Sequence, residues 1–146
     1  MVRDAHAIAQ SLRAIHGRAF EDVVAHILNR FLVHEQLVVV RGKESILAKA
    51  IGDIETAQEL VNFTKLPVKR RCTQSQLQDY PDSDLFVLKV ASRDSEKYRL
   101  MAIINCKVSF HARHTETCFW GAAVRASSYI KYVCVTEDRD IYKLKR

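Results

Sequence analysis

Apolar and polar residues follow one another along the chain in patterns that predict both helices and strands. Within residues 3–33, Phe20, Val24 and Ile27 recur three and four positions apart, the spacing of a helix with one apolar face. We expect this helix to break or kink near Gly17. The other expected elements are strand-length runs of β-branched and apolar residues and further helical stretches. In chain order, the prediction is a helix over 3–33, a strand over 36–42, an irregular helical segment over 44–66, strands over 84–92 and 97–109, a helix over 113–129 and a strand over 131–138.

This order predicts the α/β class: a mixed central β-sheet flanked by helices, with a helical insertion after the first strand. Only residues 93–96 separate the second and third predicted strands, so we expect these strands to form a hairpin. Residues 67–81 are polar and basic and read as a connector. The 146 residues contain four glycines and two prolines, which leaves few places for a linker. We therefore expect a single domain over residues 1–146, which could be a subunit or fragment of a larger protein.

The charge balance narrows the class of partner. Lysine and arginine number 23 against 17 acidic residues, giving a formal charge of +6 and a pI near 9.3. A basic protein of this kind favours a polyanionic partner such as nucleic acid. The four cysteines lack the regular spacing of a disulfide framework, and the apolar runs are too short to span a membrane. We expect a cytoplasmic protein with reduced thiols and no membrane partner.

Ionisable residues gather where the predicted hairpin should close. Asp82 and Asp84 precede the first strand of the hairpin, and Lys107 ends the second. Pairing of the strands would bring Asp84 and Lys107 together at one edge of the sheet. A carboxylate can bind a divalent cation such as Mg²⁺, and an ammonium can orient water and offset phosphate charge. Asp84 is preferred over Asp82 because it directly precedes the apolar run of the strand.

Three stretches resemble the PD-(D/E)xK nuclease superfamily, and within it the catalytic domains of type II restriction endonucleases. They are Pro81-Asp82 ahead of the hairpin, "GRAFEDVV" at 17–24, and "NCKVSFHAR" at 105–113. The element order from residue 17 to about residue 138 is similar to the αβββαβ core of that superfamily. The resemblance implies a restriction endonuclease-like fold. It also implies Mg²⁺-dependent hydrolysis of DNA that leaves a 3′-hydroxyl and a 5′-phosphate.

One position departs from the superfamily pattern. Asn105 stands two residues before Lys107, where the family has Asp or Glu, and a neutral amide binds Mg²⁺ poorly. Some restriction enzymes supply the missing carboxylate from the following helix. Glu116, at the border of the apolar stripe beside Phe119 and Trp120, suits that role. We expect Asp84 and Glu116 to hold the metal. The competing interpretation is an inactive site that is kept for DNA binding or assembly. Glu21, from the opening helix, could reach the same site as a further ligand.

Several cations are candidate phosphate contacts. They are Lys69, Arg70, Arg71, His111, Arg113, His114 and Arg125. Two other chemistries fit less well. Zinc binding by Cys106, His111, His114 and Cys118 would follow no common spacing, and Lys107 would oppose the metal. A cysteine nucleophile is conceivable, but Cys106 and Cys118 both resemble small buried apolar residues.

The leading hypothesis is thus a Mg²⁺-dependent, restriction-type endonuclease acting on double-stranded DNA. At this length little chain remains for reading bases in the major groove. We therefore expect either a homodimer or a larger specificity subunit as partner. A structure-selective nuclease of the junction-resolvase type and a catalytically silent DNA-binding or assembly module are the alternatives.

Overall fold

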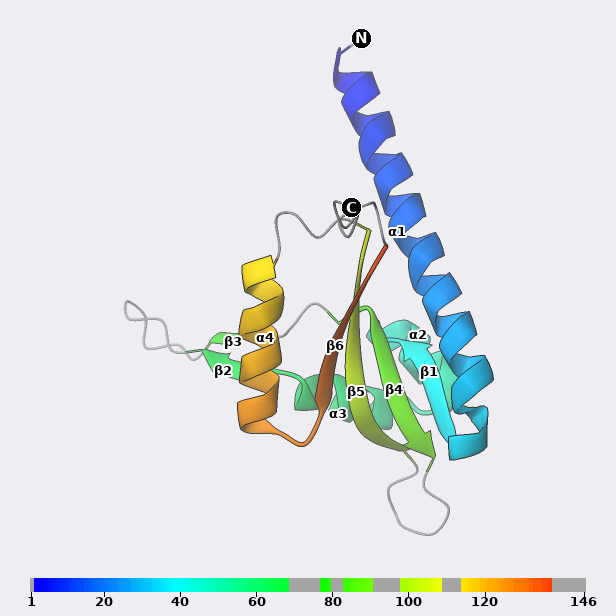
Figure 1. Cartoon of the computed structure of the whole chain (residues 1–146), viewed down its shortest axis with the longest axis vertical. Coiled ribbons are helices and arrows are strands. Elements are labelled where there is room, and N and C mark those ends of the chain that lie inside the picture. Colours follow the sequence, from blue (N-terminus) through cyan, green and yellow to red (C-terminus); the bar gives the residue numbers. More distant parts are fainter. Residues whose placement is uncertain (1, 69–76, 80–82, 91–97, 109–113, 138–146) are drawn as a thin grey trace, which may run out of the picture.

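The computed structural model describes residues 2–68, 77–79, 83–90, 98–108 and 114–137. Helices and strands alternate in it as the α/β prediction requires (Figure 1). In chain order the elements are α1 (Val2–Leu32), the short 3₁₀ helix η1 (Val33–Glu35), β1 (Leu37–Arg41), α2 (Glu44–Ile51), α3 (Ile54–Phe63), β2 (Leu66–Val68), β3 (Leu77–Asp79), β4 (Leu85–Val90), β5 (Tyr98–Lys107), α4 (His114–Ser127) and β6 (Lys131–Thr136).

A mixed four-stranded sheet forms the centre of the molecule, in the order β1-β4-β5-β6. β4 runs antiparallel to both β1 and β5, and β6 runs parallel to β5 after the crossover through α4. The predicted hairpin is therefore confirmed, with Leu85 opposite Ile104 and a register shift between Val87 and Leu88. This arrangement places the start of β4 beside the end of β5.

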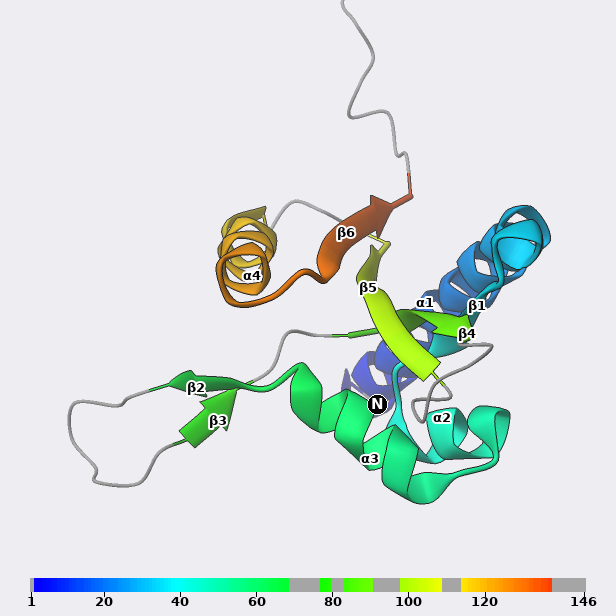
Figure 2. The same cartoon turned by 90° about the horizontal axis from the view of Figure 1, so that it is seen from below.

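Helices cover both faces of the sheet, and β4 shows why. Leu85 and Val87 belong to an apolar cluster with Val24 of α1, whereas Phe86 and Leu88 belong to a second cluster with α2, α3 and α4. A strand buried on both faces reads as a continuous apolar run, as residues 85–88 do. Figure 2 shows α1 on the opposite side of the sheet from α2 and α3.

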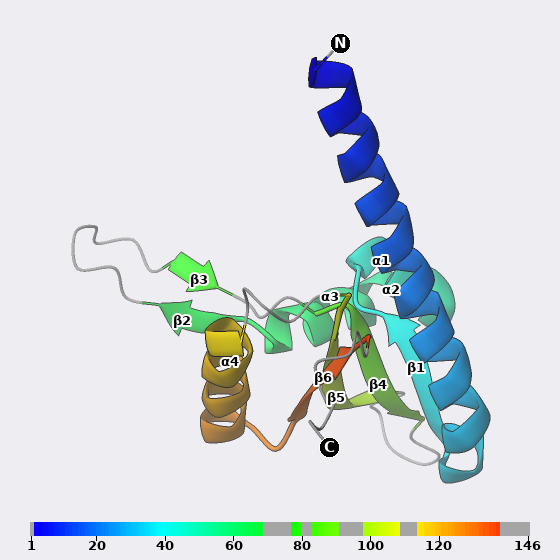
Figure 3. The ribbon, with the colours of Figure 1, turned by 45° about the horizontal axis from the view of Figure 1, so that its top comes forward.

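Helix α1 is continuous, so the predicted break near Gly17 is wrong. A single glycine in a helix costs only about 1 kcal/mol relative to alanine, and the packing of the helix outweighs this cost. Only the second half of α1 packs on the sheet, while the first half extends past it (Figures 1 and 3). The side chain of Asn29 fixes the packed half: its Nδ2 donates to Val39 O at 2.9 Å, and its Oδ1 accepts from Val39 N at 2.7 Å.

The region around the predicted connector, residues 67–81, contains two short strands, β2 and β3. These strands pair with each other in a second sheet. Each strand has three residues, and Pro67 lies in the first, so neither carries an alternating pattern that predicts a strand. Across the part of the chain that the structure covers, no helix is long and apolar enough to cross a membrane.

Gly42 is required by a close approach between the end of β1 and the start of β4. A Cβ atom at this position would lie 2.3 Å from Ser83 O and 3.2 Å from Phe86 Cε1, and Gly42 N donates to Asp84 O at 2.9 Å. Gly42→Ala is therefore expected to destabilise the fold by about 1–3 kcal/mol, because backbone must move to admit the methyl group. The measurement is the free energy of unfolding in urea.

Gly17→Ala is the matched control, since nothing lies within 4 Å of a Cβ at this helical position. It should gain up to about 1 kcal/mol from helix propensity. A Gly42→Ala variant as stable as the unsubstituted protein would contradict the steric argument.

Candidate active site

Asp84 and Lys107 meet at the edge of the sheet, as the hairpin predicted. Asp84 Oδ2 accepts a hydrogen bond from Cys106 N at 2.6 Å and lies 3.9 Å from Lys107 Nζ. The two side chains are only 16% and 13% exposed. Asp84 precedes Leu85, which pairs with Ile104, so the strand register itself brings Asp84 to the end of β5.

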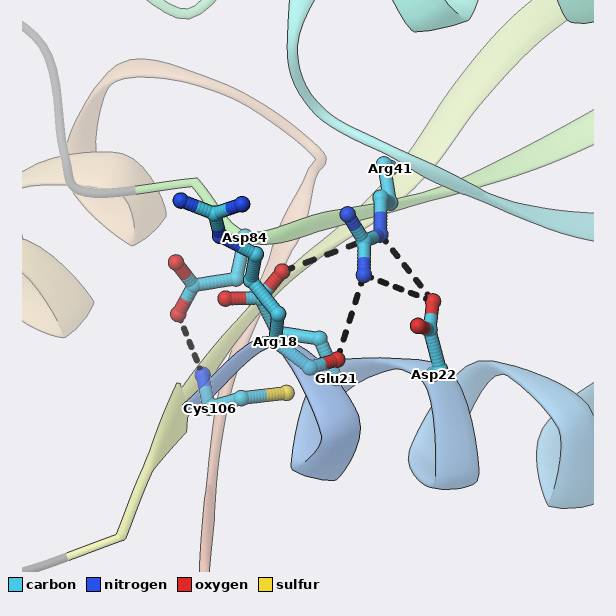
Figure 4. Close-up of polar contacts among 6 residues, drawn as sticks. All are labelled: Arg18, Glu21, Asp22, Arg41, Asp84 and Cys106. Atoms are coloured by element: carbon cyan, nitrogen blue, oxygen red, sulfur yellow. Dashed lines mark hydrogen bonds and ion pairs between the residues drawn. The ribbon is translucent and has the colours of Figure 1, made fainter. Parts of the chain in front are cut away.

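A second carboxylate, Glu21, comes to this edge from α1 (Figure 4). Partial burial raises the pKa of Glu21 above its ordinary value of 4.5, and the negative charge of Asp84 raises it further. The cations Arg41 and Lys107 act in the opposite direction. Glu21 and Asp84 come from segments far apart in the sequence, yet they are close enough to repel each other. Such a pair favours a cation between or beside its oxygens.

Arg41, the last residue of β1, fixes this part of α1 against the sheet. Its Nη2 lies 2.7 Å from Asp22 Oδ1 and donates to Arg18 O at 3.1 Å. Its Nε donates to Asp22 Oδ1 at 3.1 Å and lies 3.8 Å from Glu21 Oε2. Figure 4 shows the guanidinium between the strand and the helix. Sequence reasoning missed Arg41; the one available signal was a charged residue ending an otherwise apolar strand.

The donor set at this edge suits a hard divalent cation. Mg²⁺ is commonly held by one or two carboxylates and completes its coordination with water and substrate phosphate oxygens. Asp84 and Glu21 supply two such carboxylates. Among the residues covered by the structure, no group of three or more His, Cys, Asp or Glu side chains could hold a metal ion. A two-carboxylate site is consistent with this finding.

The cysteines do not form an alternative site in the described residues. Cys106 is buried in the cluster against α1, whereas Cys118 is exposed on α4. Burial, followed by the nearby charge of Asp84, raises the pKa of Cys106 to about 12. Its thiol is thus neutral near pH 7 and lacks the thiolate character of a nucleophile. The zinc pattern also needs His111 and the side chain of His114, which lie outside the described residues.

Asn105 occupies the position where the superfamily has its second acid. Its side chain is 1% exposed, and its Nδ2 donates to the hydroxyl of Tyr132 at 2.9 Å. Within the described part of the chain, Asn105 Oδ1 has no hydrogen-bond partner. The position is therefore filled by a buried neutral amide that is paired with the neighbouring strand.

Glu116 lies in the first turns of α4, and the side chain of the next residue, Thr117, is hydrogen-bonded to Cys134 of β6. The side chain of Glu116 itself lies outside the described residues. Of the two residues given for the predicted apolar stripe, Trp120 is buried, whereas Phe119 is exposed, so the prediction was wrong for Phe119.

Most of the remaining predicted site residues also lie outside the residues that the structure describes. Arg125 is exposed in the last turn of α4. Placement is not described for Asp82, Lys69, Arg70, Arg71, His111, Arg113 or the side chain of His114.

The raised pKa of Glu21 predicts a pH dependence of stability. Between pH 4.5 and the higher folded-state pKa, the folded protein binds more protons than the unfolded chain, so stability falls as pH rises through this window. In chelator-treated protein, Glu21→Gln removes this dependence. The free energy of unfolding in urea, measured from acidic to neutral pH, should fall more steeply for the unsubstituted protein than for Glu21→Gln. Parallel curves would contradict the buried, charge-repelled carboxylate.

Comparisons with known proteins agree with the fold. Residues 47–143 match the family described as BsaWI restriction endonuclease type 2. MjaVIP of Methanocaldococcus jannaschii, which carries the name of a type II restriction enzyme, is 30% identical over 134 residues, covering 90% of this chain and 54% of MjaVIP. The crystal structure of BsaWI in a pre-specific complex with DNA superimposes with a TM-score of 0.59 at 17% identity, covering 94% of this chain and 45% of that one.

The chain thus spans about half the length of these two relatives. The family match covers α3, the hairpin and α4, and α1 lies before it in the sequence. With a matching family over most of its length and the sheet order described above, the chain belongs to the BsaWI family of type 2 restriction endonucleases.

Proposed function

We propose that this chain is the catalytic domain or subunit of a restriction-type endonuclease that hydrolyses phosphodiester bonds in double-stranded DNA with Mg²⁺. Membership of the BsaWI family supports this reaction class. The observation that carries the proposal is the approach of Asp84 to Lys107, at 3.9 Å, with Glu21 beside them on a sheet edge.

In this proposal Asp84 and Glu21 hold the metal ion. When bound, Mg²⁺ would polarise the phosphate and lower the pKa of a coordinated water. Lys107 orients the attacking water and offsets the charge that develops on the phosphate. The Cys106 amide fixes the orientation of the Asp84 carboxylate, and Arg41 fixes the turn of α1 that carries Glu21.

Glu116 is proposed as the displaced acid that compensates for Asn105. Support for this role is that Glu116 directly precedes Thr117, whose side chain is hydrogen-bonded to Cys134 of β6. Two active sites would allow both strands of a duplex to be cut in one binding event, so we further propose that the chain works as a homodimer or beside a larger specificity subunit.

A plasmid assay tests the proposal. Supercoiled DNA incubated with the protein and Mg²⁺ should be converted to nicked and linear forms, and a chelator should prevent both. Glu116→Gln should lower the rate by at least about tenfold if its carboxylate assists the metal. Glu59→Gln, an exposed carboxylate on α3, is the matched control and should cut at the unsubstituted rate.

The buried amide of Asn105 favours one second candidate, a catalytically silent module that binds DNA or supports assembly. DNA binding without Mg²⁺-dependent cleavage, on plasmid and on branched DNA alike, would favour that module over the endonuclease.

A further inference from the structure

A cleft of about 750 Å³ opens beside the two carboxylates. Its walls come from α1, the end of β1, the start of α2, the end of α3 and the start of β4, so it lies where five elements converge. Glu21 and Asp84 lie on its wall together with Gly42. The candidate active site therefore opens into a wider recess.

The rest of the wall is rich in cations. Arg18, Lys43 and Lys65 line the cleft in addition to Arg41. Arg41 is engaged by Asp22 and Glu21, but no carboxylate in the described residues forms an ion pair with the other three. Arg18 and Lys43 are exposed and Lys65 is half-buried, so their charges face solvent in or beside the cleft.

A third acid, Glu44, lies on the same wall but forms no ion pair with these cations in the described residues. Glu44 accepts a hydrogen bond from Gln58 Nε2 at 3.2 Å and is exposed in the first turn of α2. Lys43 is the N-cap of this helix and makes no side-chain cap hydrogen bond. Glu44 in the first turn offsets the helix dipole there, so the positive charge of the cleft comes from its side-chain cations.

We propose that this cleft binds the phosphates next to the scissile one, with Arg18, Lys43 and Lys65 as their contacts. The inference rests on the proposed function and specifies where the cleaved strand lies. Glu21 and Asp84 repel a phosphate backbone unless cations compensate for them. A metal ion compensates only at the scissile group, whereas the neighbouring phosphates need fixed positive charges of the protein.

The test measures how DNA binding depends on salt. A fluorescently labelled duplex is titrated with protein in chelator, which prevents cleavage, and the affinity is followed by anisotropy at several salt concentrations. The triple variant Arg18→Ala, Lys43→Ala and Lys65→Ala should reduce the slope of log K against log salt by about 0.9 per lost contact, or about 3 in all. The loss should be the same for duplexes of unrelated sequence, since phosphate contacts do not read bases.

A second triple variant with Arg30→Ala, Lys49→Ala and Lys131→Ala is the matched control. These cations are exposed on α1, α2 and β6 and do not line the cleft, yet their removal changes the net charge equally. The conservative variant Arg18→Lys, Lys43→Arg and Lys65→Arg keeps the charges and should retain most of the slope. Thermal unfolding checks that all three variants are folded.

Equal slopes for the two alanine variants would overturn the cleft assignment. If the unsubstituted protein still cuts DNA with Mg²⁺ in that case, the proposed nuclease function stands without the cleft assignment. The cleft variant alone could lower the salt slope while the unsubstituted protein fails to cut DNA with Mg²⁺. This result would support phosphate binding in the cleft and overturn the nuclease proposal. No binding of the unsubstituted protein at low salt, either in chelator or with Ca²⁺ in place of Mg²⁺, would overturn both.

Discussion

Asp84→Asn is expected to reduce Mg²⁺-dependent DNA cleavage by about a thousandfold or more. The substitution keeps the shape of the side chain and an oxygen that can accept the hydrogen bond from Cys106 N, so the fold should be retained. It removes the negative charge that a divalent ion needs. The stabilisation that a metal gives to a phosphoryl transition state is several kcal/mol, and each 1.36 kcal/mol changes the rate about tenfold.

Two measurements check this result. Single-turnover cleavage of plasmid DNA gives the rate, and calorimetric titration with Ca²⁺ or Mn²⁺ gives metal affinity without cleavage. Both should fall together in Asp84→Asn. Asp22→Asn is a useful comparison, because Asp22 lies beside the site but its carboxylate is paired with Arg41. Full cleavage by Asp84→Asn would show that the reaction takes place elsewhere on the molecule.

Lys107→Met is expected to separate cleavage from metal binding. Cleavage should fall by about a hundredfold to ten thousandfold, the range for a group that assists proton transfer or stabilises developing charge. Metal affinity should rise, because an ammonium 3.9 Å from Asp84 Oδ2 repels a bound cation. Two unit charges about 4 Å apart repel by about 1 kcal/mol in water and about 4 kcal/mol near a protein surface, and a divalent ion doubles the repulsion.

The same calorimetric titration measures the second effect. Lys107→Arg keeps the charge and should leave metal affinity unchanged while slowing cleavage, since a guanidinium does not match the shape of an ammonium. Weaker metal binding by Lys107→Met would contradict the arrangement, because it would mean that Lys107 supports the metal site rather than competing with it.

Local patterns predicted most of the fold and the central pair of the site. The run Leu85–Leu88, the short turn and the run ending at Lys107 specify a hairpin, and the hairpin alone brings Asp84 to Lys107. The same reasoning could only suggest Glu21. Its approach to Asp84 depends on how α1 crosses the sheet, which is set by packing between distant segments.

Features without a local signature were not predictable. Arg41 is one arginine among 23 basic residues, and its role follows only from the position of α1 beside the end of β1. The β2–β3 pair consists of strands too short to show a period. Gly17 suggested a break because glycine disfavours helices, but propensity is a weak effect beside the packing that follows in the same helix.

The double hydrogen bond of Asn29 to Val39 has a consequence for how this sheet could grow. β1 is an outer strand, and the amide of Asn29 occupies both outward-facing groups of its middle residue, as an added strand would. An incoming strand from another molecule would have to displace it, so the fold resists edge-to-edge aggregation on this side. Among the described strands of this sheet, β6 forms the opposite edge.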